Sequence, residues 1–257
     1  MANRSSLGAR FVANGRFATT FLVCQASKTG MRIWPVVLAL LLCFSASAEP
    51  KRTTVTYRID SLASLELLKV KAEPRVYKSR RALRLLDASG GNPTPAGAMA
   101  VVSGTDFEDG TIEVEVAGMP RHGTPDAGAR GFIGIAFRIQ PDNAHFECFY
   151  IRPTNGRAAD QLRRNHSTQY ESEPDFPWSR LRTESPGSYE SYADLEAGAW
   201  TKIKVVVSGI QASLYVNGAD RPCLIVNDLK LGKARGRIAL WVGPETDGYF
   251  SKLIVRR

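Results

Sequence analysis

The chain has 257 residues, of which 34 are Lys or Arg and 25 are Asp or Glu, so its formal net charge at pH 7 is +9. Five basic residues and no acidic residue precede position 49, which leaves 29 basic and 25 acidic residues, a net charge of +4, on the remainder. This charge is ordinary for a soluble domain, so the composition does not indicate nucleic-acid binding, and we expect no nucleic-acid partner.

The segment from Met31 has the features of a secretory signal peptide. These features are Arg32, an apolar stretch over residues 33–44, and Ala46 and Ala48 spaced for signal-peptidase cleavage. The apolar stretch is shorter than the roughly 20 residues that span a bilayer. We therefore expect cleavage after Ala48, a secreted or periplasmic mature protein, and no stable membrane insertion after cleavage.

Residues 1–30 contain no Asp or Glu and precede the signal peptide predicted over 31–48. Either Met31 is the true start, or this stretch is an extended basic or transit-like leader. In the first case residues 1–30 are a mis-assigned extension, and in both cases the leader ends at residue 48. Residues 49–257 are then expected to form one domain, because a chain of this length fits a single β-sandwich.

Two cysteines follow the predicted leader, Cys148 and Cys223. They either form one disulfide in an oxidising compartment or remain two isolated thiols. Neither the cysteines nor the three histidines have the spacing of a metal site, so we expect no metal and no cofactor.

The mature segment consists of short apolar runs separated by Gly, Pro, Asn and Asp, which is the pattern of an all-β sandwich or barrel. Strands are expected within 53–60, at both ends of 75–87, and within 99–104, 110–118, 131–140, 145–153, 199–209, 210–220, 222–232, 235–243 and 248–257. Residues 61–70 fit either a short helix or a strand. Residues 90–97 and 119–131 are expected to be loops. The strict alternation over 110–118 points Ile112, Val114 and Val116 inward.

The C-terminal third resembles a known family. "GAWTKIKVVVSGIQASLYVNG" (198–218) is similar to the Trp-strand-turn-strand-Asn-Gly passage of laminin-G-like domains, and "GRIALWVGPETDGYFSKLIV" (236–255) is similar to their closing pair of strands. This resemblance, which covers roughly 107–255, implies the concanavalin A-like lectin/glucanase fold, a jelly roll of two curved antiparallel sheets. Laminin-G-like domains can bind calcium, but no acidic loop here has a clear ligand spacing.

A second resemblance falls on "GIAFRI" (134–139) and "FECFYI" (146–151). These runs are similar to the Ser-Gly-Ile-x-Phe-Arg … Tyr-Glu-x-x-Ile pattern of bacterial 3-keto-disaccharide hydrolase-type domains, which share this fold. The chain departs from the pattern at Ile133, where an Asn-Ser pair would precede the glycine. The resemblance implies hydrolase or lyase activity on a glycoside.

The two runs form a predicted hairpin with a charged residue in each strand. With Asp142-Asn143 at the centre of the turn, Arg138 faces Glu147 across the hairpin. Alternation then assigns one face to the core and the other to the concave surface of the jelly roll. The expected core face is Ile133, Ile135, Phe137, Ile139, Phe146, Cys148 and Tyr150, and the expected concave face is Gly134, Ala136, Arg138, Gln140, His145, Glu147 and Phe149.

On the expected concave face, Gly134 and Ala136 leave space above the sheet for a ligand. Arg138 and Glu147 either bind a polyol there or form a plain cross-strand ion pair on a solvated face. The Arg138 guanidinium is expected to keep the Glu147 carboxyl ionised, because a nearby positive charge lowers a carboxyl pKa.

Residues 154–195 are too long for an ordinary connection and are rich in aromatic and polar side chains, so we expect them to roof this face. Parts of them, "NHSTQYES" (165–172) and "GSYESYADL" (187–195), have strand character. Aromatic rings stack on pyranose rings, and polar groups bind their hydroxyls. Trp178 is either a stacking platform or an anchor for the loop. The candidate ligand-binding residues are Arg138, His145, Glu147, Arg163, Arg164, Asn165, His166, Gln169, Tyr170 and Trp178.

These features predict a secreted domain that binds a carbohydrate or glycoside on its concave face. The first alternative is a glycoside hydrolase or lyase, which needs two carboxyl groups about 5–10 Å apart. Laminarinase-type glucanases of this fold carry Glu-x-Asp-x-(x)-Glu on one strand, and this chain has no such run. Glu147 is then the catalytic candidate, with Asp160, Glu171, Glu173 or Asp175 as its partner. The second alternative is a protein-interaction domain without a sugar ligand.

Overall fold

The computed structural model describes residues 53–88, 98–123 and 128–257. These residues belong to one compact unit. The predicted leader (1–48) and the expected loop over 90–97 lie outside the described residues. Within the part of the chain that the structure describes, no helix is long and apolar enough to cross a membrane.

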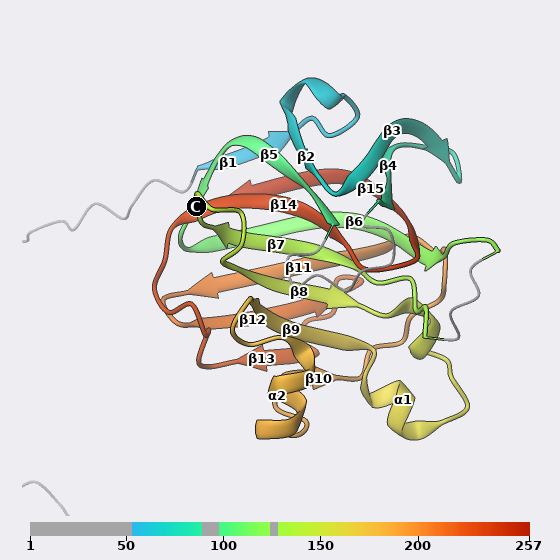
Figure 1. The fold of residues 1–257 in the computed structure, drawn as a ribbon, viewed down its shortest axis with the longest axis vertical. Helices are drawn as coiled ribbons and strands as arrows, with labels where there is room; N and C mark the ends of the chain where they lie inside the picture. Colours follow the sequence, from blue (N-terminus) through green and yellow to red (C-terminus); the bar gives the residue numbers. More distant parts are fainter. Residues whose placement is uncertain (1–52, 89–97, 124–127) are drawn as a thin grey trace, which may run out of the picture. The chain divides into compact units, whose positions relative to one another are not determined.

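The described residues form two antiparallel sheets that pack face to face (Figure 1). Sheet A has the order β13 (Leu224–Val226), β12 (Gln211–Val216), β11 (Thr201–Ser208), β6 (Gly110–Pro120), β15 (Thr246–Arg256), β4 (Arg80–Asp87) and β3 (Val70–Tyr77), with β1 (Thr54–Tyr57) also paired to β15. Sheet B has the order β10 (Glu190–Ser191), β9 (Thr168–Glu173), β8 (Phe146–Ile151), β7 (Ile133–Ile139), β14 (Gly236–Val242), β5 (Ala98–Phe107) and β2 (Leu65–Leu68).

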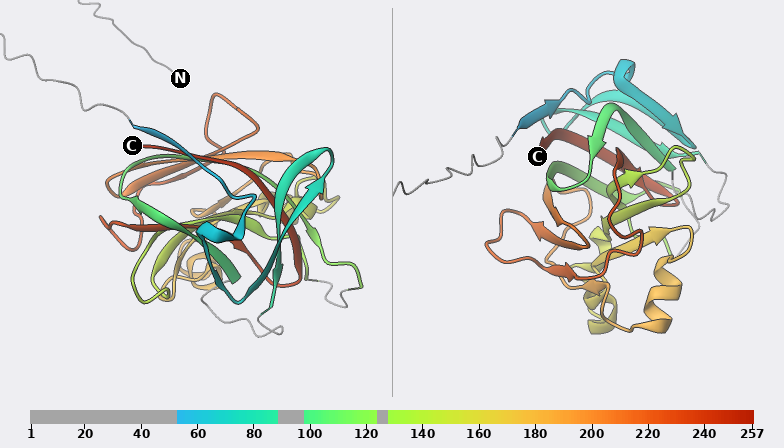
Figure 2. Two further views of the ribbon diagram at one scale, coloured as in Figure 1. Left: turned by 90° about the horizontal axis from the view of Figure 1, so that it is seen from above. Right: turned by 90° about the vertical axis from the view of Figure 1, so that its left-hand side faces the viewer.

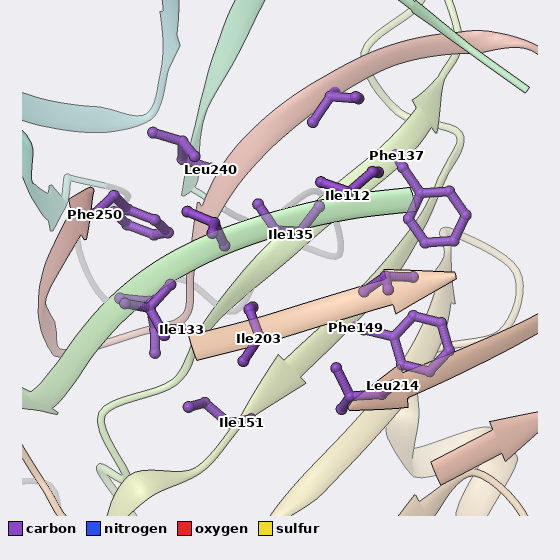
Figure 3. Packing of buried hydrophobic residues seen from close by; sticks show 14 of the residues in the cluster. Ile112, Ile133, Ile135, Phe137, Phe149, Ile151, Ile203, Leu214, Leu240 and Phe250 are labelled. Atoms are coloured by element: carbon purple, nitrogen blue, oxygen red, sulfur yellow. The ribbon is translucent and has the colours of Figure 1, made fainter. Parts of the chain in front are cut away.

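The main core lies between the two sheets, on what we call their inner faces. Ile112 and Ile203 point into it from sheet A, and Ile135, Phe149 and Leu240 point into it from sheet B (Figure 3). All five are at most 1% exposed, so this face supplies the hydrophobic stabilisation that the alternating strands predict. The inward direction expected for the apolar residues of 110–118 is confirmed.

Most expected strands are confirmed, because each predicted apolar run coincides with a strand of the sandwich. The ambiguous segment 61–70 contains both a 3-10 helix, η1 (Leu62–Ser64), and β2. The prediction that residues 154–195 cover one face of the sheet is wrong, because β9 and β10 of this segment are strands of sheet B itself. The rest of that segment contains η2 (Pro153–Asn155), α1 (Gln161–Asn165) and α2 (Trp178–Glu184), and both helices lie at the β9–β10 end of the sandwich (Figures 1 and 2).

The predicted hairpin register is correct at the turn and wrong in the strands. The Gln140 amide donates to the His145 carbonyl oxygen at 2.9 Å, as the expected turn requires. Farther along, Phe137 pairs with Glu147, which is a shift of one residue. The extra residue is Arg138, whose φ of +53° places it in the left-handed region. This β-bulge also shifts the pairing of β7 with β14.

The bulge changes which face each side chain occupies, because a slip of one residue sends alternate side chains to the opposite face. Phe149 therefore lies on the inner face, where Ile135 and Phe137 were correctly expected. Ile139, Phe146, Cys148 and Tyr150, which were expected in the main core, belong to a second apolar layer on the outer face of sheet B. Cys148 and Cys223 are both free thiols.

Candidate functional site

The expected pairing of Arg138 with Glu147 is wrong. Both side chains are completely buried, and both lie on the inner side of sheet B as a result of the bulge. The Arg138 guanidinium donates instead to the carbonyl oxygens of Glu108 (2.9 and 3.0 Å), Gly209 (2.7 Å) and Gly232 (2.7 Å), and to Oδ1 of Asp109 (3.1 Å). Arg138 thus joins three connections of the sandwich and offers nothing to a ligand.

Glu147 has a comparable structural role. Its carboxylate accepts hydrogen bonds from the Leu231 amide at 2.8 Å and from the Tyr170 hydroxyl at 2.5 Å. Burial raises the pKa of Glu147, and this effect outweighs the charge of Arg138, so the expected lowering is also wrong. Because Glu147 faces the interior, it cannot share a reaction site with Glu171 or Glu173, which lie on the outer face.

The expected open space above Gly134 and Ala136 is filled. A Cβ on Gly134 would lie 2.1 Å from the Phe149 carbonyl oxygen and 2.6 Å from the Tyr150 Cα. Ala136 is fully buried in the outer apolar layer, where the rings of Tyr150 and Trp241 stack with their centroids 4.7 Å apart. A ligand cannot reach the floor of the sheet at this point.

A cluster of polar side chains adjoins this apolar layer on the outer face, and Tyr150 belongs to both. We call it the β9 cluster, and it consists of Tyr150, Arg152, Gln169, Glu171 and Glu173, each at most 5% exposed. The strands bring these residues together because Tyr150 pairs with Gln169, while Cys148 and Phe146 pair with Glu171 and Glu173. Five polar side chains on one buried surface are unusual, since buried polar groups cost free energy unless they are bonded.

Arg152 links the cluster together. Its guanidinium donates to the Tyr150 hydroxyl at 3.1 Å and to Oε1 of Gln169 at 3.0 Å. It also donates to the His166 carbonyl oxygen at 3.0 Å, and it lies 5.1 Å from the Tyr150 ring centroid. A positive charge is thereby held against an aromatic face and beside Glu171.

The two carboxyl groups of the cluster are shifted towards their neutral forms. Burial raises the pKa of Glu171 to about 7, against the opposing effects of Arg152 and the Trp178 amide. Burial and the neighbouring Glu171 raise the pKa of Glu173 to about 8. Near neutral pH these groups can therefore act as hydrogen-bond donors as well as acceptors.

Two polar atoms on this face have no hydrogen-bond partner. Among the described residues, Oε2 of Glu173 and Nε1 of Trp241 are buried and unpaired. Native proteins bond nearly all of their buried polar atoms, so each exception requires an explanation. A polar ligand bound at this face would provide hydrogen-bond partners for both atoms.

Helix α2 forms the accessible rim of the cluster. Trp178, its first residue, is 42% exposed and lies with its ring centroid 4.7 Å from the Arg182 guanidinium and 6.0 Å from that of Arg152. Arg182 donates to Glu190 at 2.6 Å, and Nε2 of His166 lies 3.1 Å from the same carboxylate. The rim thus combines an exposed indole with cations and a carboxylate.

The structure brings together only some of the candidate residues. His166, Gln169 and Trp178 lie in the β9 cluster or at its rim. Tyr170 points into the main core, and His145 lies in the hairpin turn beside Asp142. The remaining three belong to α1: Arg163 bonds Asn155 and Thr154, Arg164 packs on Tyr192, and Asn165 accepts from Gln161.

The sequence reasoning missed Tyr150, Arg152, Arg182, Glu190 and Trp241. Tyr150 alternates with Phe149 and Ile151 on β8, and Arg152 directly follows that strand, so the correct register would have placed Tyr150 on the outer face. Trp241 follows the same alternation on β14. Among the residues that the structure describes, no group of three or more His, Cys, Asp or Glu side chains could hold a metal ion.

No protein-family model and no curated protein matches the sequence. Solved structures match in fold. The carbohydrate-binding module CBM66 from Bacillus subtilis aligns with a TM-score of 0.50 at 10% identity, over 75% of this chain and 95% of that chain. A Bacillus subtilis protein of unknown function with a galectin-like fold has a TM-score of 0.45 at 12% identity, over 72% and 87% of the two chains. A lectin from Bauhinia forficata in complex with GalNAc has a TM-score of 0.42 at 14% identity, over 80% and 98%.

At these identities the similarity establishes the fold alone. The similarity to CBM66, together with the two antiparallel sheets, confirms the expected jelly-roll sandwich fold. The narrower resemblances to laminin-G-like and 3-keto-disaccharide hydrolase-type domains stay predictions.

Proposed function

We propose that this protein is a carbohydrate-binding β-sandwich whose ligand contacts the β9 cluster and the rim of α2. The observation that carries the proposal is the exposed indole of Trp178 next to a buried polar cluster with unpaired atoms. An indole stacks on the apolar face of a pyranose ring, and Arg and carboxyl groups bind the hydroxyls. The structural similarity to a carbohydrate-binding module supports this assignment.

In this proposal the ligand lies on the outer face of sheet B, which we take to be the concave face of the jelly roll. Arg182 and Glu190 take the ligand-binding role that was expected of Arg138 and Glu147. Gln169 and Arg152, which are hydrogen-bonded to each other, lie next to them. The signal-peptide features of residues 31–48 support a site of action that is secreted or periplasmic.

Trp178→Ala is expected to reduce glycan binding by about tenfold or more, because it removes the exposed stacking surface of the rim. The backbone amide of residue 178, which bonds Glu171, is retained in this variant. The measurement is a glycan array followed by titration of the best ligand with wild-type and variant protein.

Tyr192→Ala is the matched control, since Tyr192 is a comparably exposed aromatic residue (39%) that packs on Arg164 of α1. Its binding should equal that of wild type. Equal binding by wild type and Trp178→Ala would remove this site from consideration. A protein that binds no glycan on the array would instead favour the protein-interaction alternative.

The second candidate function is that of a glycoside hydrolase or lyase. Glu171 and Glu173 are two residues apart on one face of β9, and pKa values of about 7 and 8 suit a general acid near neutral pH. Incubation with 3-keto-glucosides and β-glucans tests this candidate. Turnover should vanish in both Glu171→Gln and Glu173→Gln, and turnover that survives in both variants would contradict it.

A further inference from the structure

A hollow of about 210 Å³ opens on the outer face of sheet A, the sheet that does not carry the β9 cluster. Glu115 of β6 and Lys202 of β11 face outward here, because their neighbours Val114 and Ile203 are buried in the core. The residues that line the hollow are Arg80, Glu115, Trp200, Lys202, Asn217 and Gly218.

One wall of the hollow is aromatic. The Trp200 ring meets the edge of Tyr77 at a centroid distance of 5.8 Å, and Tyr77 stacks on Tyr249 at 4.0 Å. The guanidinium of Arg80 lies 5.3 Å from the Trp200 centroid. The indole is thus fixed by packing and combined with a cation, an arrangement that presents a flat apolar surface beside hydrogen-bond donors.

Cations outnumber carboxylates in the ion-pair network to which the lining residues Arg80, Glu115 and Lys202 belong. The cations are Arg80, Lys202, Lys252 and Arg256, and the carboxylates are Glu113 and Glu115. Arg80 forms an ion pair with Glu115, and Lys202 lies 2.7 Å from Glu113. Each carboxylate is shared with a second cation, which leaves two positive charges in excess.

The two cations that line the hollow keep free capacity. The side chains of Arg80 and Lys202 are 43% and 49% exposed, whereas that of Glu115 is 18% exposed. A guanidinium has five N–H donors and an ammonium has three, so the ion pairs do not exhaust them. The surface that a ligand meets is therefore donor-rich and positive.

We propose that this hollow is a second saccharide site and that it takes an acidic saccharide. Arg80 and Lys202 bind the carboxylate of a uronic acid residue, and the pyranose ring packs against Trp200. A neutral sugar offers both cations only uncharged hydroxyl acceptors, whereas a carboxylate forms hydrogen bonds with each of them in which donor and acceptor are both charged. This site is independent of the β9 cluster, since it lies on the other sheet.

The test is calorimetric titration of the protein with galacturonate, glucuronate, mannuronate and guluronate trisaccharides, and with their methyl esters, at 0.15 M NaCl. Salt at this concentration screens diffuse attraction beyond about 8 Å. At least one acid should bind about tenfold more tightly than its ester. Arg80→Gln and Lys202→Gln should each weaken that binding by about tenfold, because each loses one charged hydrogen bond.

Lys204→Gln is the matched control. Lys204 lies on the same strand and face as Lys202 but contacts the Tyr215 ring, at 4.0 Å, outside the hollow. It should change affinity by less than about twofold, and Trp178→Ala should leave binding intact. The proposal is overturned if none of the four acids binds, if acid and ester bind equally, or if Lys204→Gln is as damaging as Lys202→Gln.

Discussion

Arg138→Ala is expected to lower the free energy of unfolding by about 3–5 kcal/mol, because it removes a fully buried guanidinium that bonds three partly buried carbonyl groups, and each carbonyl left without a partner costs roughly 1–3 kcal/mol. The substitution would strand the carbonyl oxygens of Glu108, Gly209 and Gly232, which belong to three different connections. The left-handed backbone of residue 138 costs about 1–2 kcal/mol for any residue with a Cβ, and the variant would lack the guanidinium contacts that offset this cost. Urea unfolding of wild type and variant measures the loss.

Arg235→Ala is the control for this prediction. Arg235 bonds the carboxylates of Asp106 and Glu108 at the same end of the sandwich, but its side chain is 59% exposed. Exposed ion pairs contribute little, so this variant should unfold close to wild type. Equal losses in the two variants would mean that the buried guanidinium does not hold the three connections together.

The strands could be predicted from the sequence because alternation reports burial directly. The run over 110–118 alternates strictly, and its apolar residues are inward in the structure. The bulge at Arg138 could not be predicted in this way, since it depends on contacts with residues up to 94 positions distant. The register of β7 with β8 therefore depends on a long-range network of hydrogen bonds. The register predicted from the local pattern alone differs from it by one residue.

This error spread to the candidate site. The predicted pair of Arg138 and Glu147 is a reasonable inference from a regular hairpin, yet one extra residue sends both side chains inward. Gln169 and Trp178 were found because their segment combines aromatic and polar residues, a feature that does not depend on register. Arg182 and Glu190 were missed because neither residue type nor spacing showed that α2 packs beside β9.

The free energy of unfolding of wild type, measured relative to that of Glu171→Gln, is expected to fall by about 3 kcal/mol between pH 5 and pH 8, as follows from the shifted pKa of Glu171. Glu171 has an ordinary pKa of 4.5 when unfolded, and burial raises it to about 7 in the folded protein. Across this interval the folded state holds more protons than the unfolded state, so stability falls as pH rises. The loss is absent below the unfolded pKa and complete above the folded pKa. Chemical unfolding of both proteins at several pH values measures the difference.

Glu73→Gln separates this effect from a general response to pH. The Glu73 carboxyl is exposed, and its hydrogen bond with Arg75 lowers its pKa. Its folded and unfolded states therefore differ in bound protons mainly on the acidic side of this interval, and the difference between Glu73→Gln and wild type should stay nearly flat between pH 5 and pH 8. A flat difference for Glu171→Gln as well would mean that the β9 cluster is ionised and solvated. If the cluster binds a glycan, the slope of this stability difference against pH should become smaller when a glycan saturates the protein. The reason is that hydroxyl donors of the ligand stabilise the charged carboxylates, which the empty cluster keeps protonated.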